Sequence, residues 1–307
     1  MERLAVIDLG SNSVRMSIFD IESNVVWRQS SGYRNMIKLS RGMTEDMMLQ
    51  PDAQLRAVSA LLEYKSILEK EGVTKVRIVA TAAVRKAKNG KEFVKTVKDV
   101  TGFDIEVIDG ETEAALDCLA ISGTLGIDRA VVCDIGGGST EFIAVADGVM
   151  QKPAISKPMG SRSITEMFLS CGETKEFLAE ASAYVEKHVG ELPWADKMQG
   201  VPIVGIGGTL RALAKYHIND EDIECVSRYS ISAEEIDRIF ELIVNSSPQE
   251  RRNMPGIGEE RADIIVGGLL PLMHLKKELN SPELIVSDVG VREGILFEYL
   301  KKEYKGE

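Results

Sequence analysis

One pattern occurs twice in this chain: an apolar strand ends in Asp-x-Gly, turns tightly and continues as a second strand. The first copy covers residues 4–19 with Asp8 at its turn, and the second covers residues 131–145 with Asp134 at its turn. Glycine and serine in such a turn allow backbone N–H groups to converge on an anion, and an aspartate at the strand end can hold a divalent cation beside it. A sharp turn between buried strands also favours these residues, so one copy alone would indicate little about function.

A third glycine turn, Gly205–Thr209, follows an apolar strand and opens a helical stretch. Two Asp-x-Gly hairpins about half a chain apart, together with this turn, predict a duplicated fold whose two lobes face each other across a phosphate site. The arrangement resembles the actin-like superfamily of sugar kinases, acetate kinases and chaperone ATPase domains. The resemblance implies an α/β, duplicated actin-like (ribonuclease H-like) two-domain ATPase fold with the active site in the interdomain cleft.

Composition limits the partners that we expect. With 307 residues, of which 44% are hydrophobic, the chain can bury a large core and form two domains. Its 37 basic and 48 acidic residues give a net charge of −11, which argues against a general binder of nucleic acid or anionic membranes. A polyanionic substrate would therefore need a local basic patch. No apolar run approaches the ~20 residues that span a bilayer, and the N-terminus lacks a signal-peptide pattern, so we expect a cytoplasmic protein.

Cysteine and histidine do not form a recognisable site. The cysteines have no C-x-x-C spacing, and Cys133 stands in an apolar strand, so it is expected to be a buried side chain and not a redox or zinc site. No histidine lies near another histidine or near a glycine motif, so the three histidines are interpreted as structural. The residues in question are Cys118, Cys133, Cys171, Cys225, His188, His217 and His274.

The elements between the motifs place the domain boundary. A short connection at residues 126–128 precedes the second hairpin, which gives a first domain over residues 1–125 and a second over 126–290. Pro51 predicts the start of a helix that ends at Gly72, and residues 25–31 predict a strand after the first hairpin. Residues 261–279 predict one long apolar helix, which suits a buried core and a homodimer interface equally.

With these pieces together, the sequence resembles the Ppx/GppA family of exopolyphosphatases and guanosine pentaphosphate phosphohydrolases. The matching stretches follow the order of the family and cover nearly the whole chain, at residues 8–13, 80–85, 110–114, 134–141, 207–209, 255–263 and 286–294. The chain resembles the short two-domain form, because it ends soon after residue 294 and has too few histidines for an HD-type module. The family's last helix packs onto the first domain, so residues 291–307 are assigned there.

The resemblance implies a hydrolase that removes the terminal orthophosphate of inorganic polyphosphate, or the terminal 5′-phosphate of the stringent-response nucleotide pppGpp, with Mg²⁺ or another divalent cation. The catalytic carboxylate of the family precedes the alanine of its Gly-x-Glu-Glu-Ala motif, and that position is Glu113. The chain departs from the motif at Thr112, where the family often has a second glutamate. Glu113 is therefore the sole residue expected to orient and deprotonate the attacking water.

The remaining candidate residues surround the expected phosphate chain. Asp8 and Asp134 are expected to hold the metal, with Glu141 as a further ligand. Arg85 follows the end of a strand, where open α/β sheets bind their ligands. The candidate phosphate contacts are Gly10, Ser11, Asn12, Ser13, Arg15, Arg85, Gly136, Gly137, Gly138, Ser139, Gly207, Gly208 and Thr209.

Three alternatives to an exopolyphosphatase stay open. The motifs do not separate polyphosphate from pppGpp, because both present a terminal phosphoanhydride. The Gly205–Thr209 turn resembles the adenosine-contacting turn of the actin-like superfamily, which indicates an ATPase or small-molecule kinase. A non-catalytic sensor of polyphosphate or of an alarmone is the third alternative. The sequence also leaves open the chain-length preference, the metal, any monovalent cation and the oligomeric state.

Overall fold

The two hairpins become the first strands of two separate sheets. A computed structural model describes residues 2–23, 26–43, 46–220, 222–223 and 225–305. The chain forms two compact units, unit 1 from Met1–Ala120 with Val291–Glu307 and unit 2 from Ile121–Gly290. The division falls within helix α4 (Gly110–Leu125), slightly before the predicted boundary after residue 125.

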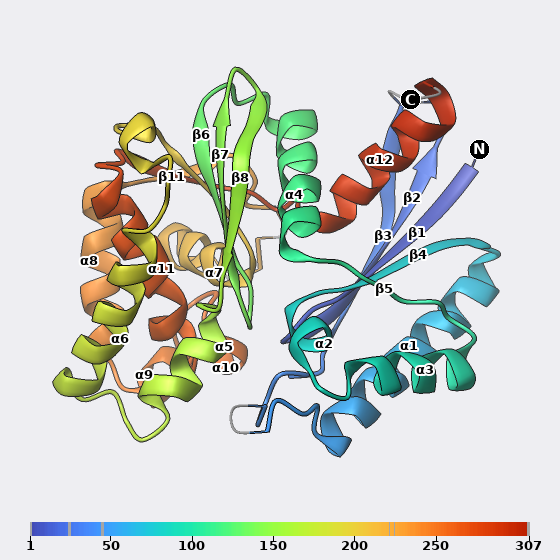
Figure 1. Ribbon diagram of the computed structural model, residues 1–307, viewed down its shortest axis with the longest axis horizontal. Coiled ribbons are helices and arrows are strands. Elements are labelled where there is room, and N and C mark those ends of the chain that lie inside the picture. The colour runs from blue at the N-terminus through green and yellow to red at the C-terminus, as the bar shows by residue number, and fades with distance from the viewer. Residues whose placement is uncertain (1, 24–25, 44–45, 221, 224, 306–307) are drawn as a thin grey trace. The chain divides into compact units, whose positions relative to one another are not determined.

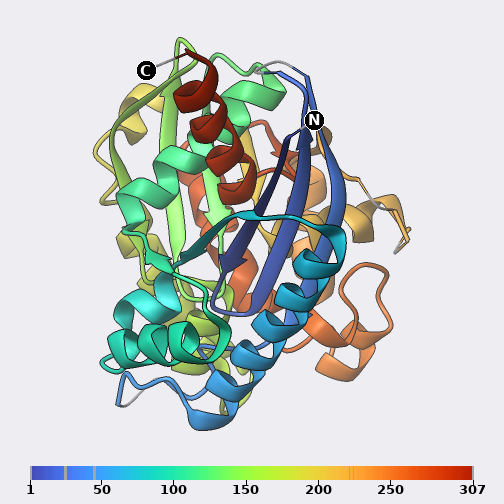
Figure 2. The ribbon, with the colours of Figure 1, turned by 90° about the vertical axis from the view of Figure 1, so that its right-hand side faces the viewer.

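Unit 1 contains a five-stranded sheet in the order β3-β2-β1-β4-β5 (Figures 1 and 2). Its strands are β1 (Glu2–Leu9), β2 (Ser13–Ile21), β3 (Trp27–Met36), β4 (Lys75–Ala80) and β5 (Glu106–Val107). Its helices are α1 (Pro51–Glu71), α2 (Ala82–Lys86), α3 (Gly90–Thr101), the first part of α4, and α12 (Val291–Lys305). The predicted strand over residues 25–31 begins outside the described residues, and β3 begins at Trp27.

Unit 2 contains a six-stranded sheet in the order β10-β11-β9-β6-β7-β8. Its strands are β6 (Ala130–Ile135), β7 (Thr140–Ala146), β8 (Val149–Lys157), β9 (Ile203–Ile206), β10 (Tyr229–Ser232) and β11 (Glu283–Val286). Its helices are α5 (Ser161–Ile164), the π-helical η1 (Thr165–Leu169), α6 (Lys175–Val189), the 3₁₀ turn η2 (Ala195–Met198), α7 (Gly208–Ile218), α8 (Ala233–Val244), α9 (Pro248–Arg252), α10 (Gly258–Arg261) and α11 (Ile265–Glu278).

The strand pairing confirms the predicted duplication. In unit 1, β1, β2 and β3 form an antiparallel meander, and β4 and β5 add in parallel beside β1. In unit 2, β6, β7 and β8 form the same meander, and β9 and β11 add in parallel beside β6. Only β10, an antiparallel edge strand that the sequence did not predict, has no counterpart among the described residues of unit 1.

Alternation along the strands decides which face of the unit 1 sheet each side chain joins. Ala5, Ile7 and Leu9 of β1 join the core formed with α1 and α3, whereas Leu4 and Val6 join a second core with α12. Figure 1 shows α1 and α3 on one face of this sheet and α12 on the other. The period of two therefore places Asp8 on the α12 face.

The last helix packs closely within unit 1. The apolar residues Ile295 and Leu296 of α12 are fully buried against the sheet. A Cβ added at Gly294 would lie 2.2 Å from the backbone oxygen of Leu116 in α4, so a side chain does not fit between the two helices. This contact fixes the N-terminal end of α12, which carries Arg292 and Glu293.

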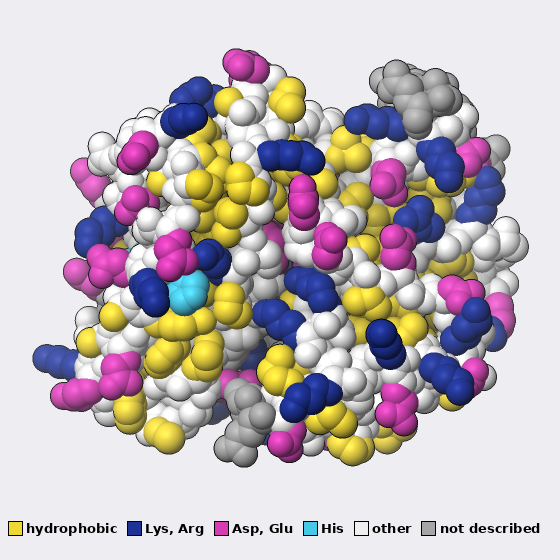
Figure 3. Space-filling model, viewed as in Figure 1, with side chains coloured by type: hydrophobic (Ala, Val, Ile, Leu, Met, Phe, Trp, Pro, Cys, Tyr) yellow, Lys and Arg dark blue, Asp and Glu magenta, His cyan; other side chains and the backbone are white. Residues whose placement is uncertain are grey.

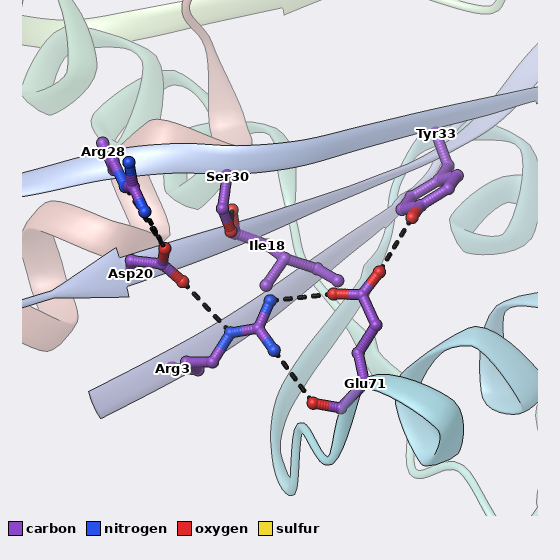
Figure 4. Close-up of polar contacts among 7 residues, drawn as sticks. All are labelled: Arg3, Ile18, Asp20, Arg28, Ser30, Tyr33 and Glu71. Atoms are coloured by element: carbon purple, nitrogen blue, oxygen red, sulfur yellow. Dashed lines mark hydrogen bonds and ion pairs between the residues drawn. The ribbon is translucent and has the colours of Figure 1, made fainter. Parts of the chain in front are cut away.

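A polar network closes the opposite end of the same sheet (Figure 4). Register places Arg3, Asp20 and Arg28 side by side on β1, β2 and β3, and the Asp20 carboxylate accepts from both arginines. Arg3 also donates to Glu71 at the end of α1, at 2.8 Å, and the Tyr33 hydroxyl donates to the same carboxylate at 3.0 Å. The network joins the end of α1 to three strands.

Helices α5 to α8 and α11 cover one face of the unit 2 sheet. Helix α11 is at the centre of this core, because ten of its 14 residues are buried. Its burial within unit 2 removes the reason to assign it to a dimer interface, and the homodimer stays a prediction. The prediction of one continuous helix over residues 261–279 is wrong: α10 ends at Arg261 and α11 begins at Ile265.

Candidate active site

The two Asp-x-Gly turns have the same backbone geometry. In unit 1 the amide of Gly10 donates to the carbonyl of Ser13 at 3.1 Å. In unit 2 the amide of Gly136 donates to the carbonyl of Ser139 at 3.0 Å. The duplication therefore extends from the order of the strands to the hydrogen bond that closes each turn.

The carbonyl groups of the unit 1 turn are held from one side. The segment after β3 supplies the donors: the amides of Ile37 and Lys38 both donate to the carbonyl of Asn12, and the amide of Ser40 donates to that of Ser11. In a trans peptide the C=O and the following N–H point in opposite directions. The N–H groups of Asn12 and Ser13 therefore point away from this segment.

The segment after β8 holds the unit 2 turn in the same way. The amide of Ser161 donates to the carbonyl of Gly136 at 2.9 Å, and the amide of Arg162 donates to that of Gly137 at 3.0 Å. The Oγ of Ser163 donates to the carbonyl of Gly138 at 3.1 Å. The following N–H groups of the turn consequently point away from α5, which is the arrangement that an anion-binding turn needs.

The residue seven positions after each aspartate distinguishes the two turns. Asp8 is paired in register with Arg15, whereas Asp134 is paired with Glu141. Glu141 is almost completely buried and accepts from the Oγ of Ser156 at 2.7 Å. Two paired carboxylates supply the oxygen ligands that Mg²⁺ prefers, so Asp134 and Glu141 fit a divalent cation better than Asp8 beside Arg15 does.

Several charges act on Asp8. Burial raises the pKa of the Asp8 carboxyl, whereas the positive charges of Arg15 and Arg292 lower it, and Glu293 adds to the rise. Arg292 is held on the same face of the sheet, because its Nη1 donates to the Oγ of Ser17 at 2.8 Å.

Among the described residues, no group of three or more His, Cys, Asp or Glu side chains lies close enough together to hold a metal ion by itself.

Glu113 and Arg85 form an ion pair in unit 1. Glu113 lies in the first turn of α4 and is 7% exposed, and Arg85 lies at the end of α2. Nη1 of Arg85 is 3.0 Å from Oε2 of Glu113 and donates to the carbonyl of Ile108 at 2.7 Å. The contact of Arg85 with phosphate stays a prediction, and the structure shows this guanidinium bonded to the Glu113 carboxylate instead of standing alone.

The third glycine turn lies next to the second. A Cβ at Gly207 would be 2.9 Å from Oδ1 of Asp134 and 2.5 Å from the carbonyl oxygen of Ile135, so only glycine allows this approach. Gly207 also has a φ of 97°, which disfavours other residues. Thr209 is completely buried, and its Oγ1 lies against Gly268 of α11.

Sequence reasoning assigned no role to Arg261 or Arg292. The guanidinium of Arg261 lies directly over Gly208, where a Cβ would come within 1.7 Å of Nη2. Both arginines stand within family-matching stretches, at residues 255–263 and 286–294, and that was the available signal. Their positions beside Gly208 and Asp8 depend on long-range packing, which no local pattern encodes.

Cys133 is a buried side chain, as the sequence predicted. It lies in β6 directly before Asp134 and is completely buried. Burial raises the pKa of its thiol, and the nearby Asp134 and Glu141 carboxylates raise it further. A thiol kept protonated in this way is a poor nucleophile and a poor metal ligand.

Comparison with known proteins gives one consistent result. The profile described as the Ppx/GppA phosphatase family matches residues 25–303. The chain is 28% identical over 309 residues to a Haemophilus influenzae protein named "Putative exopolyphosphatase", with 99% of this chain and 93% of that protein covered. It is also 28% identical to the bifunctional 3-dehydroquinate synthase/phosphatase of Fusobacterium nucleatum, with 92% of this chain but only 44% of that protein covered.

Solved structures agree with this match. A Ppx/GppA family member from Aquifex aeolicus superposes with a TM-score of 0.82 at 30% identity, and the match covers 99% of both chains. An exopolyphosphatase from Cytophaga hutchinsonii superposes with a TM-score of 0.88 over 98% of both chains, and at 24% identity this likeness is one of fold. The predicted α/β actin-like fold class is confirmed. No helix in the described part of the chain is long and apolar enough to cross a membrane.

Proposed function

The chain belongs to the Ppx/GppA phosphatase family, a family of hydrolases, and from this premise we propose that it removes the terminal orthophosphate of inorganic polyphosphate. The observation that carries the proposal is the pair of turns in which the carbonyl groups of consecutive residues, Ser11 and Asn12 in unit 1 and Gly136 to Gly138 in unit 2, are held from one side. Each turn thereby presents N–H groups to an anion, and polyphosphate offers a chain of anions. The name of the Haemophilus influenzae protein supports the same substrate.

Glu113 is proposed to act on the attacking water. One carboxylate oxygen is held by Arg85 at 3.0 Å, which fixes the plane of the group. A carboxylate held in this way can accept a proton from water while the water oxygen forms a bond to the terminal phosphorus. The phosphoanhydride P–O bond then breaks, and the shortened polyphosphate leaves with the bridging oxygen.

Positive charge must balance the polyanion, because phosphoryl transfer depends mainly on positioning and charge neutralisation. Arg15 and Arg85 are proposed to contact phosphate oxygens, and Arg261 beside Gly208 and Arg292 beside Asp8 add two further cations. The Asp134 and Glu141 pair of unit 2 is proposed to hold Mg²⁺, and a role for Asp8 as a metal ligand stays a prediction from the sequence. When bound, the ion would neutralise phosphate charge and polarise the scissile bond.

The test compares orthophosphate release from tripolyphosphate, long-chain polyphosphate, pppGpp and ATP, each with Mg²⁺ and with EDTA. We expect the two polyphosphates to be hydrolysed fastest and EDTA to stop release while circular dichroism shows an unchanged fold. Preferential hydrolysis of pppGpp would show that pppGpp, and not polyphosphate, is the substrate. Release from ATP alone, or from no substrate, would overturn the proposal.

A further inference from the structure

The unit 2 turn is held in place by residues 160–163, to which no role has been assigned. Gly160 directly precedes α5, and the other three residues are the first three of that helix. This segment supplies five hydrogen bonds to the turn, three from backbone amides and two from serine hydroxyl groups. A further hydrogen bond runs in the opposite direction just before this segment: the Oγ1 of Thr140, directly after the turn, donates to the carbonyl of Met159 at 2.8 Å. We propose that Gly160 and Ser163 are positioning residues that aim the N–H groups of this turn at the phosphate chain. The inference rests on the proposed function of the turn as a phosphate cradle.

Gly160 is required for its size and not for its backbone conformation. Its φ of −71° and ψ of 159° are available to any residue. A Cβ at this position would nevertheless lie 2.4 Å from both the carbonyl carbon of Gly137 and the amide nitrogen of Gly138. These are backbone atoms of the turn, which cannot rotate out of the way as the end of a flexible side chain can. Any side chain at residue 160 therefore displaces the turn itself.

Ser163 orients the last peptide of the turn. Its Oγ donates to the carbonyl of Gly138 at 3.1 Å, and its amide donates to that of Gly137 at 3.1 Å. The Gly138 carbonyl and the Ser139 N–H belong to one planar peptide, so a bond that pulls the oxygen toward α5 turns the N–H of Ser139 away from it. The Ser163 hydroxyl thereby determines the direction of the Ser139 N–H, although it does not contact that group.

Residues 160–163 are themselves held by Thr165 and by helix α11. Thr165 Oγ1 donates to the carbonyl of Ser161 at 2.8 Å. Helix α11 approaches with two glycines, and a Cβ at Gly268 would lie 2.8 Å from the Cβ of Ser161. Since α11 is buried in the core of unit 2, the position of the cradle is tied to the close-packed core of that unit.

The experiment measures kcat and KM for tripolyphosphate in Gly160→Ala, Ser163→Ala and Ser163→Thr. We expect KM to rise about tenfold in Gly160→Ala and about fivefold in Ser163→Ala, the range for a lost or misaligned hydrogen bond to a charged group. We expect kcat to change less than about twofold, because the donors act on bound substrate before and during reaction. Ser163→Thr keeps the hydroxyl and should restore KM.

Two matched variants in the same unit control for general damage. Gly190 has an ordinary backbone conformation, with its nearest neighbour 3.4 Å from an added Cβ, and Ser170 is exposed after η1. Gly190→Ala and Ser170→Ala should keep the wild-type KM. Unchanged KM in Gly160→Ala and Ser163→Ala, or a loss confined to kcat and melting temperature, would overturn the inference and leave the proposed function intact.

A binding measurement separates the two proposals. Titration calorimetry with tripolyphosphate and EDTA-treated protein measures the affinity of the unit 2 turn for phosphate in the absence of turnover. If wild-type protein binds tripolyphosphate but hydrolyses no substrate, the proposed reaction fails, and weaker binding by Ser163→Ala still supports the positioning role. Equal binding by the wild type and Ser163→Ala, or no binding by the wild type, contradicts the positioning role.

Discussion

Residues 15 and 141 occupy equivalent places in the two hairpins and carry opposite charges. Each lies across the ladder from the aspartate of its turn, so one hairpin presents an acid beside a base and the other presents two acids. The proposed polyanion and its counterion fit this division, because a cation binds best between carboxylates and a phosphate binds best beside a guanidinium. The duplicated turns have therefore diverged at the residue that decides their charge.

Glu113 is the residue on which turnover should depend most. Replacement Glu113→Gln keeps the shape of the side chain and an oxygen for Arg85, but it removes the group that accepts a proton. We expect orthophosphate release to slow at least about a hundredfold, the usual scale for a lost general base, with tripolyphosphate binding and melting temperature maintained. Single-turnover release measures the rate, and calorimetry measures tripolyphosphate binding and the melting temperature.

Glu111 provides the matched control for this variant. It lies two residues earlier in the same helical turn, is exposed, and occupies the variable position of the motif. Glu111→Gln should keep the wild-type rate. Full activity in Glu113→Gln would show that another group activates the water.

At the scale of elements, each turn works together with the segment that follows the third strand of its sheet. Strand β3 leads to residues 37–40 and strand β8 leads to residues 160–163, and both segments bond the carbonyl groups of their turn. The sequences of the two segments have little in common, but their places after the meander are equivalent. The fold, rather than a shared motif, therefore provides the support behind both cradles.

A buried ion pair fixes the element that carries Arg261. Arg251 at the end of α9 is completely buried, donates to the carbonyl of Ile243 at 2.8 Å and pairs with Glu173 before α6. Its Nη1 also reaches the carbonyl of Ala262, directly after Arg261. Glu173→Gln leaves the Arg251 charge buried without a matching anion, and we expect it to lower the free energy of unfolding by about 3 kcal/mol in urea denaturation.

The exposed pair between Lys277 and Glu186 serves as the comparison in the same unit. Exposed pairs contribute little to stability, because water solvates both partners well. Glu186→Gln should therefore unfold at nearly the wild-type urea concentration. Equal losses in the two variants would contradict a special role for the buried pair.

At the scale of the whole molecule, the chain carries 48 acidic and 37 basic residues. On the face shown in Figure 3, basic side chains alternate with acidic ones and form no broad basic field, which agrees with the net charge of −11. Attraction of the proposed polyanion would then depend on a few arginines beside the turns, and the local basic patch expected from the sequence stays a prediction.

Stability should fall in acid because of the network in Figure 4. Hydrogen bonds from Arg3 and Tyr33 lower the pKa of Glu71. Burial would raise the pKa of Asp20, but hydrogen bonds from Ser30, Arg28 and Arg3 outweigh it and lower the pKa overall. Because both folded pKa values lie below those of the unfolded chain, this stabilisation is complete above a pH of about 4.5 and is lost as the pH falls through the folded values.

Urea denaturation between pH 7 and pH 3 checks this dependence. Glu71→Gln should be less stable than the wild type at pH 7 and should lose less stability on acidification. The exposed Glu69 in the same helix is the control, and Glu69→Gln should keep the wild-type pH dependence. Parallel curves for wild type and Glu71→Gln would disprove the contribution of this carboxylate.

The sequence by itself determined the duplication, the two aspartate turns, the family and the candidate catalytic glutamate. These features are local: an Asp-x-Gly turn needs particular residue types at adjacent positions, because only glycine allows the close approach of backbone and ligand. The helix from Pro51 to Gly72 was predicted for the same reason, since proline and glycine act at its ends.

Only the tertiary structure decided which groups meet across long separations. The pairing of Arg85 with Glu113, the place of Arg261 over Gly208 and the support of the unit 2 turn by residues 160–163 join segments that are far apart in the chain. The break between α10 and α11 likewise coincides with the contact between Arg251 and the Ala262 carbonyl, which no hydrophobic pattern encodes. Periodicity specifies the face on which a side chain lies, but the partner on that face is set by the packing of the whole unit.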